Sequence, residues 1–235
     1  MIKVIAEIGW NHCGDMNIAK KMIESAKKSG ADYAKFQTWS TTRLKSGEWD
    51  KDGRREIYKK AELSKNDHLE LKSFCENLKI EFLSSVFSIP DAELIYEIGC
   101  ETVKIPSFES RNADLIAYCN EKFKTIIMSC GTSTFEEIKE SVKLINKADL
   151  YLMHCVSVYP GEYYEANLPK MHELKMLCNK VGLSDHIEGV ESSKIAIGEG
   201  AVILEKHFTI DNDLPGRDNK FAILPKQLKD LTDFI

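Results

Sequence analysis

Short apolar runs alternate with amphipathic stretches along the whole chain. Eight of the runs have the length and composition of buried parallel strands, and they lie at 4–8, 33–36, 80–83, 102–105, 125–128, 150–153, 181–183 and 202–204. Between them, apolar residues recur at spacings of three and four, which predicts helices at 18–28, 68–78, 92–98, 135–146 and 192–198. Gly30, Gly99 and Gly200 follow three of these stretches, where a left-handed residue would end the helix.

Eight strands that alternate with helices predict an α/β fold, the (β/α)8 TIM barrel, with residues 1–235 as a single domain. The rival fold is a doubly wound open sheet. It is disfavoured because no GxGxxG motif follows the first strand, and because polar residues follow nearly every strand instead of one switch point. The connection 38–64, which carries Trp39, Trp49 and Tyr58, is long enough to predict a lid or a partner surface.

Composition narrows the classes of function. The chain is 43% hydrophobic and 29% charged, as is ordinary for a globular protein, and no apolar run approaches the ~18 residues of a membrane helix. The first residues have the pattern of a strand and not of a signal peptide. A net charge of -5 argues against a nucleic-acid partner. Seven cysteines without a CxxC pair predict reduced thiols, and with them a cytoplasmic protein.

Candidate chemistry gathers at the carboxyl ends of the predicted strands, where TIM barrels carry their active sites. The polar residues there are Glu7, Asn11, His12, Lys35, Gln37, Ser84, Ser85, Lys104, Ser107, Glu109, Ser129, His154, Ser157, Tyr159, Ser184, His186, Glu205 and His207. Two lysines and several hydroxyls around one opening suit an anionic substrate that carries phosphate or carboxylate. His186 and His207, one strand–helix unit apart and with a carboxylate close by, suit a divalent metal such as Mn²⁺, Fe²⁺, Co²⁺ or Zn²⁺.

Several of these residues also have a purely structural interpretation. A lone lysine at a strand end is more often solvated or ion-paired than functional. Lys35 and Lys104 therefore support a functional site only when they are considered together. Cys130 and Cys155 are expected to fill space and not to act as nucleophiles. Asp185 is expected to orient its neighbours.

The remaining histidines are assigned structural places. His154 is expected to be a hydrogen-bonded residue of the inner wall rather than a ligand. His68 and His172 fall within helical patterns and are expected at the surface.

Eight ordered segments of the chain match the motifs of one known family. They are AEIGWNHCGD (6–15), GADYAKFQT (30–38), KIPS (104–107), MSCG (128–131), HCVSVYP (154–160), GLSDH (182–186), EKHFT (205–209) and LPGRD (214–218). On these segments, and over nearly all of its length, the chain resembles the sialic acid synthases. Members of that family condense phosphoenolpyruvate with an N-acetylated hexose.

The resemblance implies a role for each matching position. It makes His186 and His207 the ligands of a divalent metal, Mn²⁺ or Mg²⁺. The residues implied to hold the phosphate and carboxylate of phosphoenolpyruvate are Lys35, Lys104, Ser107, Ser129, Ser157, Tyr159 and Ser184, and Ser85 keeps a hydroxyl where many relatives have Ser-Thr-Pro. Those implied to face the sugar and the reacting carbons are Glu7, Gln37, Glu109 and Asp218.

The family's mechanism gives these residues their chemistry. The metal polarises the aldehyde of the open-chain sugar, C3 of phosphoenolpyruvate attacks it, and water adds at C2. Phosphate then leaves by C–O cleavage, so that a nine-carbon 2-keto-3-deoxy acid is formed. Glu7 or Glu109 would transfer protons near the metal-bound oxygen.

The chain also departs from the family pattern. Relatives continue into a small antifreeze-like domain that contacts the N-acyl group in the partner subunit, whereas this sequence ends at Ile235. The expectation is a truncated or barrel-only member, completed by a homodimer or by a separate chain. The leading function is a synthase that uses an acceptor like N-acetylmannosamine to make a sialic, legionaminic or pseudaminic acid. Two alternatives stay open: a phosphoenolpyruvate-condensing synthase with a different aldose acceptor, and a non-catalytic barrel that binds a sugar acid.

Overall fold

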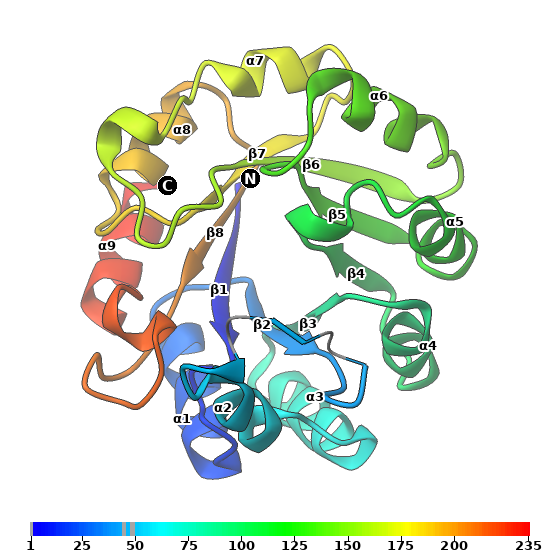
Figure 1. Ribbon diagram of the computed structural model, residues 1–235. Coiled ribbons are helices and arrows are strands. Elements are labelled where there is room, and N and C mark those ends of the chain that lie inside the picture. Colours follow the sequence, from blue (N-terminus) through cyan, green and yellow to red (C-terminus); the bar gives the residue numbers. More distant parts are fainter. Residues whose placement is uncertain (1, 44–45, 48–49) are drawn as a thin grey trace.

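Eight parallel strands close into a barrel in the computed structural model, which describes residues 2–43, 46–47 and 50–235. The strands are β1 (Lys3–Gly9), β2 (Tyr33–Thr38), β3 (Glu81–Val86), β4 (Thr102–Ile105), β5 (Thr125–Ser129), β6 (Asp149–Cys155), β7 (Val181–Asp185) and β8 (Ile203–His207). They pair in chain order, and β1 also pairs with β8, so the sheet is closed (Figure 1). The TIM barrel predicted from the alternation is confirmed, and the open sheet is excluded.

Helices surround the barrel (Figure 1). They are α1 (Met16–Lys28), α2 (Arg54–Ala61), α3 (Lys65–Leu78), α4 (Ile89–Glu97), α5 (Ala113–Lys122), α6 (Phe135–Lys143), α7 (Lys170–Lys175), α8 (Glu191–Gly198) and α9 (Pro225–Phe234). The five predicted helices correspond to α1, α3, α4, α6 and α8. Capping boxes at Ser64 and Thr134 begin α3 and α6, which satisfies N–H groups of the first turn. Gly30, Gly99 and Gly200 have the positive φ expected of residues that end helices.

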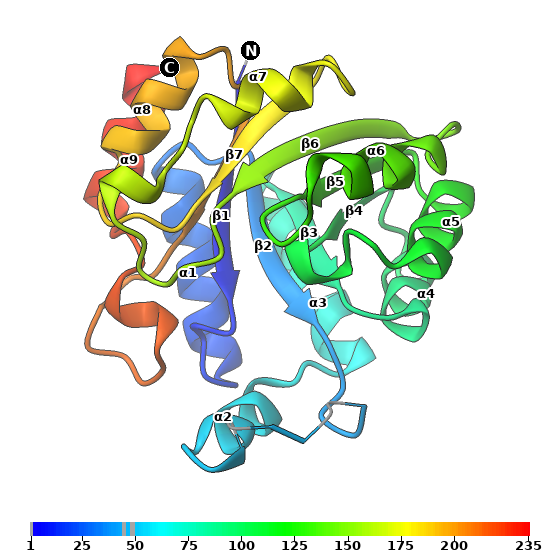
Figure 2. The ribbon, with the colours of Figure 1, turned by 45° about the horizontal axis from the view of Figure 1, so that its top comes forward.

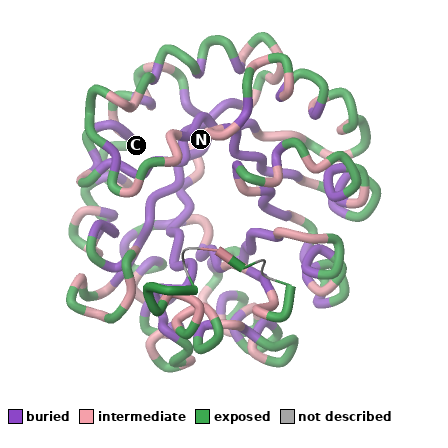
Figure 3. Tube along the Cα trace, viewed as in Figure 1, coloured by how far each residue is buried: buried purple, intermediate pink, exposed green. Residues whose placement is uncertain are grey.

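Side chains alternate along each strand between the barrel interior and the helix layer. The interior contains a small apolar cluster of Ile5, Leu83, Ile127, Met153 and Ile203. A larger apolar core fills the space between strands and helices, and the buried trace in Figure 3 follows the strands and the inner faces of the helices.

Several strands extend beyond the apolar runs from which they were predicted. β2 continues to Thr38, β3 to Val86 and β8 to His207. The apolar pattern predicts that each of these strands ends where its apolar run gives way to polar residues. In the barrel, alternate polar side chains point into the interior, so the strand continues through them. Most of the candidate site residues therefore belong to strands and not to the loops that follow.

Two polar residues that belong to strands and were expected at the opening of the barrel face the helix layer instead. Since Met153 points into the interior, the next residue, His154, points outward, and its Nε2 lies 2.7 Å from the carbonyl oxygen of Ala166. The expected hydrogen bond is present, but the inner-wall placement was wrong. Ser84 also faces outward and shares a hydrogen bond of 2.6 Å with Thr38.

The two histidines that were expected on helices differ in their burial. His68 is fully buried, with Nε2 2.8 Å from Thr38 Oγ1 and Nδ1 2.8 Å from the carbonyl oxygen of Ser64, so its surface placement was wrong. His172 is exposed and bonds Glu199, as expected. His12, predicted at the opening, is buried against Phe36 of the outer core, with its ring centroid 5.9 Å from that ring.

The long connection 38–64 contains α2, which lies beyond the arrowhead of β2 (Figure 2). Trp39 and Tyr58 of this connection pack with Trp10 in a small aromatic cluster. Trp49 lies outside the described residues. No helix in the described part of the chain is both long and apolar enough to cross a membrane.

Candidate active site

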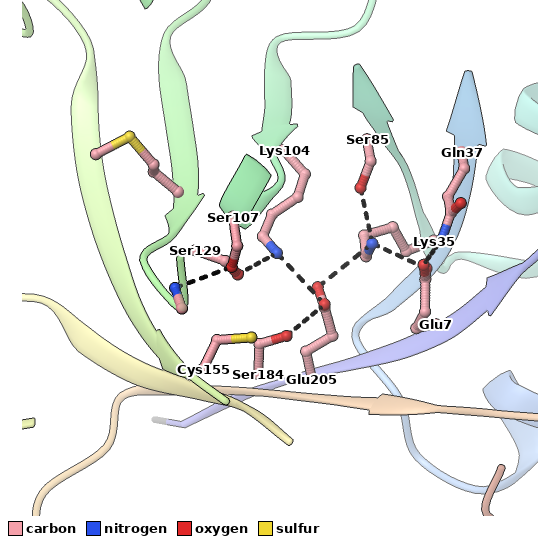
Figure 4. A network of polar contacts seen from close by, with 12 residues as sticks. Glu7, Lys35, Gln37, Ser85, Lys104, Ser107, Ser129, Cys155, Ser184 and Glu205 are labelled. Atoms are coloured by element: carbon pink, nitrogen blue, oxygen red, sulfur yellow. Dashed lines mark hydrogen bonds and ion pairs between the residues drawn. The ribbon is translucent and has the colours of Figure 1, made fainter. Parts of the chain in front are cut away.

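A layer of polar side chains lies directly above the apolar cluster of the barrel interior. This interior polar layer consists of Glu7, Lys35, Ser85, Lys104, Ser129, Cys155, Ser184 and Glu205, which Figure 4 shows converging from the surrounding strands. Five of its members stand two residues beyond a member of the apolar cluster, as Glu7 stands beyond Ile5. Because strand side chains repeat every two residues, both sets point into the same space.

Glu205 is the centre of the layer. Its carboxylate accepts hydrogen bonds from Ser184 Oγ at 2.9 Å and from Lys104 Nζ at 3.3 Å, and Lys35 Nζ lies 3.6 Å away. The two ammonium groups therefore converge on one acid. All three charged side chains are less than one-tenth exposed.

Each lysine has a further partner on its own side of the barrel. Lys35 donates to Ser85 Oγ at 2.9 Å and pairs with Glu7 Oε2 at 2.9 Å. Lys104 donates to Ser129 Oγ at 2.7 Å. Hydroxyl and ammonium donors thus alternate around the same space, an arrangement that would stabilise phosphate or carboxylate oxygens.

The buried charges shift one another's pKa values. Burial opposes the charge of Glu205, but Lys104 and Lys35 outweigh it and lower the pKa of Glu205 to about 2. Burial also opposes the charge of Lys35, yet Glu205 and Glu7 raise the pKa of that lysine. For Lys104 burial prevails and lowers the pKa. Burial likewise raises the pKa of Glu7, which makes this carboxyl a candidate proton carrier.

Gln37 lies next to Glu7, beyond the interior polar layer and nearer to the opening of the barrel. Gln37 Nε2 donates to Glu7 Oε1 at 2.6 Å. Glu7 Oε2 is buried and pairs with Lys35 Nζ at 2.9 Å, so both oxygens of this carboxyl have a polar partner.

The histidine pair, His186 and His207, lies beside this layer with ring centroids 5.5 Å apart. His186 Nδ1 is 2.7 Å from the carbonyl oxygen of Val156, which fixes this nitrogen as the donor and leaves Nε2 as the nitrogen that can bind a metal. Burial lowers the pKa of His207 well below its ordinary value, so this ring is neutral, the form that binds metals. His207 Nδ1 is buried and has no hydrogen-bond partner among the described residues.

Two further residues of the predicted site, Tyr159 and Asp218, lie next to the histidine pair. The Tyr159 ring lies 4.1 Å from the His186 ring, and burial raises the pKa of its phenol. Asp218 Oδ2 is 3.8 Å from His207 Nδ1. The indole of Trp10 donates a hydrogen bond to the Asp218 carboxylate.

These groups fit a divalent ion that retains open coordination positions. The described residues contain no cluster of three or more His, Cys, Asp or Glu side chains suited to a metal, so the two imidazoles would be the protein ligands of an ion. His207 Nδ1 is one of the buried polar atoms that have no hydrogen-bond partner among the described residues, so it is free to bind such an ion. Cys155 Sγ lies 3.7 Å from His186 Nδ1; burial opposes protonation, but this neighbour outweighs it and raises the pKa of His186.

Three predicted residues lie outside the ion-pair network. Ser107 Oγ accepts a hydrogen bond of 3.0 Å from the backbone N–H of Gly131. Ser157 Oγ is 4.0 Å from Cys155 Sγ. Glu109 accepts a hydrogen bond of 2.8 Å from Asn112, and within the described ranges no hydrogen bond or ion pair joins it to the lysines or to the histidine pair.

Glycine is required at position 131, where the loop after β5 closes on the loop after β6. A Cβ there would lie 2.7 Å from the carbonyl oxygen of Cys155 and 2.8 Å from Ser157 Oγ. The two loops can therefore lie this close only because residue 131 has no side chain. Burial raises the pKa of the adjacent Cys130 to about 12, so its thiol stays protonated.

Sequence reasoning gave no role to Glu205, although it stood among the polar residues at the strand ends. The signal was present, since Glu205 lies two residues before His207 on the same face of β8. The interior position of Cys155, two residues after Met153, follows from the same period.

Comparison with known proteins gives the chain its family. The family model described as the NeuB family matches residues 22–235. The N,N'-diacetyllegionaminic acid synthase of Campylobacter jejuni is 36% identical over 243 residues, which cover 96% of this chain and 73% of that protein. The pseudaminic acid synthase of Helicobacter pylori is 36% identical over 236 residues, covering 94% and 69%. The solved structure of N-acetylneuraminic acid synthetase from Leptospira borgpetersenii has a TM-score of 0.93 at 34% identity, covering 99% of this chain and 82% of that one. The chain belongs to the NeuB family.

Proposed function

We propose that the chain condenses phosphoenolpyruvate with an N-acetylated hexose such as N-acetylmannosamine and releases phosphate. The product would be a nine-carbon 2-keto-3-deoxy sugar acid of the sialic, legionaminic or pseudaminic type. The names of the Campylobacter and Helicobacter relatives support this product class. The observation that carries the proposal is the convergence of Lys35 and Lys104 on Glu205, beside two imidazoles, on one side of a closed barrel.

The interior polar layer would bind the anionic donor. Lys35 and Lys104 supply ammonium donors, and the serines of neighbouring strands supply hydroxyls. Glu205 holds both lysines in place before the ligand arrives, so little reorganisation is needed when phosphoenolpyruvate binds. The hydroxyls of Ser107, Ser157 and Tyr159 lie on the loops beyond the strands and would close the donor site.

The acceptor would lie between the histidine pair and Glu7. A divalent ion, Mn²⁺ or Mg²⁺, when held by His186 and His207, would supply a Lewis acid for the acceptor carbonyl. The carbonyl oxygen gains negative charge when the carbon–carbon bond forms, and it must then take up a proton. Glu7, with its raised pKa, is the residue to which we assign delivery of that proton, and Gln37 keeps its carboxyl oriented.

Release of phosphate tests the proposal directly. The purified protein is incubated with phosphoenolpyruvate, Mn²⁺ and each of a panel of N-acetylated hexoses, and inorganic phosphate is measured. We expect release with at least one such sugar and a sugar-acid product of matching mass, while His172→Ala, a change at an exposed histidine, retains activity. Release only with aldoses that lack an N-acyl group would overturn the acceptor class. No release with any acceptor would overturn the catalytic assignment.

A further inference from the structure

A buried ion pair joins β7 to β8 directly behind the histidine pair. Lys206 Nζ lies 3.2 Å from Asp185 Oδ2, and the two side chains are 2% and 1% exposed. The residues face each other in the last pair of the β7–β8 ladder. Asp185 immediately precedes His186, and Lys206 immediately precedes His207. The ion pair therefore holds the two strands together one residue before each ring.

The pair lies on the outer face of the barrel, since Ser184 and Glu205 on the same strands face the interior. Its surroundings satisfy both charges. Ser192 and Ser193 at the start of α8 donate to Asp185 Oδ2 at 2.6 and 2.7 Å. Because these donors belong to α8, the carboxylate fixes the helix to the end of β7 as well as to β8.

The same two side chains also hold the backbone on the far side of His186. The N–H of Ile187 donates to Asp185 Oδ1 at 3.0 Å, and Lys206 Nζ donates to the carbonyl oxygen of Ile187. His186 is therefore fixed through the residues before and after it. Its own carbonyl oxygen accepts a hydrogen bond of 3.0 Å from Gly161, so the backbone at this position is held from three directions.

A buried ion pair seldom stabilises a fold more than a hydrophobic pair of equal volume would, because both charges lose their hydration. Burial accordingly lowers the pKa of Lys206. What ionic and directional contacts add is a defined register. The contact lies one residue before each histidine, where a change of register would alter the separation of the two rings.

We propose that Asp185 and Lys206 are positioning residues that set the separation of the His186 and His207 rings and, through it, the affinity of the site for a divalent cation. The inference rests on the proposed metal site at these two histidines. Outer-shell partners of metal ligands typically change metal affinity about 10- to 100-fold. Since Asp185 and Lys206 act through the backbone, we expect an effect of about tenfold.

The test measures Mn²⁺ binding to the full chain, with free Mn²⁺ followed by electron paramagnetic resonance. Asp185→Asn and Lys206→Met are each expected to weaken binding about tenfold, whereas Lys206→Arg, which keeps the charge, stays near the wild-type value. The matched control is Asp149→Asn. It removes an exposed ion pair with Lys180 at the opposite end of β6 and β7, and it should leave Mn²⁺ affinity unchanged.

A double variant separates positioning from general stability. Asp185→Asn combined with Lys206→Met leaves no unpaired buried charge, so its melting temperature should recover relative to either single variant. Its Mn²⁺ affinity should remain low, because the register contact is still missing. Recovery of affinity together with stability would overturn the positioning role, as would wild-type affinity in Asp185→Asn.

The metal site itself is tested in the same experiment. Wild-type binding that is lost in His207→Ala supports the site on which the inference rests. If the wild-type chain binds no Mn²⁺, the metal assignment fails and the inference fails with it. If the chain binds Mn²⁺ through His207 and both ion-pair variants bind it equally well, only the inference fails.

Discussion

Lys104 Nζ lies 3.3 Å from Glu205 Oε1, although β4 and β8 stand on opposite sides of the barrel. The contact spans the interior, so the polar side chains form a floor above the apolar cluster. In the proposed reaction the anionic donor would bind above this floor, where it would meet both lysines. Glu205 contacts both ammonium groups and so holds each lysine at this floor.

Replacement of Lys104 tests the donor side of this arrangement. Lys104→Ala should raise the KM for phosphoenolpyruvate strongly, because a charge-assisted contact typically contributes ~1.5–3 kcal/mol, which corresponds to roughly 10- to 150-fold. The measurement is phosphate release at varied phosphoenolpyruvate concentration. Lys180→Ala removes an exposed lysine and serves as the control. Unaltered dependence on the donor in Lys104→Ala would contradict its role.

Replacement of His207 tests the metal side. His207→Ala should abolish metal-dependent turnover while the barrel remains folded, because the ring lies at the carboxyl end of β8 and its Nδ1 has no hydrogen-bond partner in the described part of the chain. Activity is measured across a Mn²⁺ titration, and folding by circular dichroism. Turnover equal to that of the wild type would remove the metal assignment.

The alternation of apolar and amphipathic stretches was sufficient to predict the barrel and five of its helices. The helix α2 was not predicted, since Ala61 is its only buried residue and its other apolar contacts, Ile57 and Tyr58, are only partly buried against the aromatic cluster. The sequence also did not predict where the strands end. Near its carboxyl end a strand of this barrel has polar residues on its inner face, so its apolar run stops before the strand does. In β2 the apolar run stops at Phe36, although the ladder continues to Thr38.

Which face of a strand points inward depends on how the sheet closes, and a strand buried on both sides carries no alternation to reveal it. For this reason His154 was placed inside, although it is the next residue, Cys155, that faces the interior as the expected space-filling thiol. The contact between Lys104 and Glu205 is a further example. The two residues are 101 positions apart in the chain, and only closure of the barrel brings them together.

The lowered pKa of Glu205 predicts a pH dependence of stability. Its folded-state pKa is about 2, below the ordinary value of 4.5, so the ionised carboxylate favours the folded state. This contribution is complete above the unfolded-state pKa and is lost as the pH falls from about 4.5 towards 2. Melting temperatures across this range should fall less steeply in Glu205→Gln than in the wild type, and Glu205→Gln should already be less stable at pH 7.

The control for this effect is Glu121→Gln, which changes an exposed carboxylate paired with Lys147. It should reproduce the wild-type slope. If Glu205→Gln also followed the wild-type slope, the assignment of a strongly acidic Glu205 between two lysines would be wrong.

Trp10 and Trp39 provide a matched pair of substitutions for the acceptor side. Both indoles belong to the aromatic cluster with Tyr58 of α2. The indole of Trp10 donates to Asp218, whereas Trp39 Nε1 is buried without a hydrogen-bond partner among the described residues. Burial raises the pKa of Asp218, and the Trp10 N–H opposes that rise. Trp10→Phe should therefore raise the pKa of Asp218 further, and the acid limb of the kcat/KM profile for the sugar should move to higher pH.

The same variant should raise the KM for the acceptor about tenfold, the effect of losing one hydrogen bond to a charged group, while the KM for phosphoenolpyruvate stays the same. Trp39→Phe removes an N–H that bonds no described partner, so both constants and the pH profile should match the wild type. Steady-state kinetics with each substrate varied in turn gives all these values. Equal effects of the two substitutions would mean that cluster packing, and not the contact with Asp218, governs acceptor binding. A rise in the KM for phosphoenolpyruvate in Trp10→Phe would place the influence of Trp10 on the donor site instead.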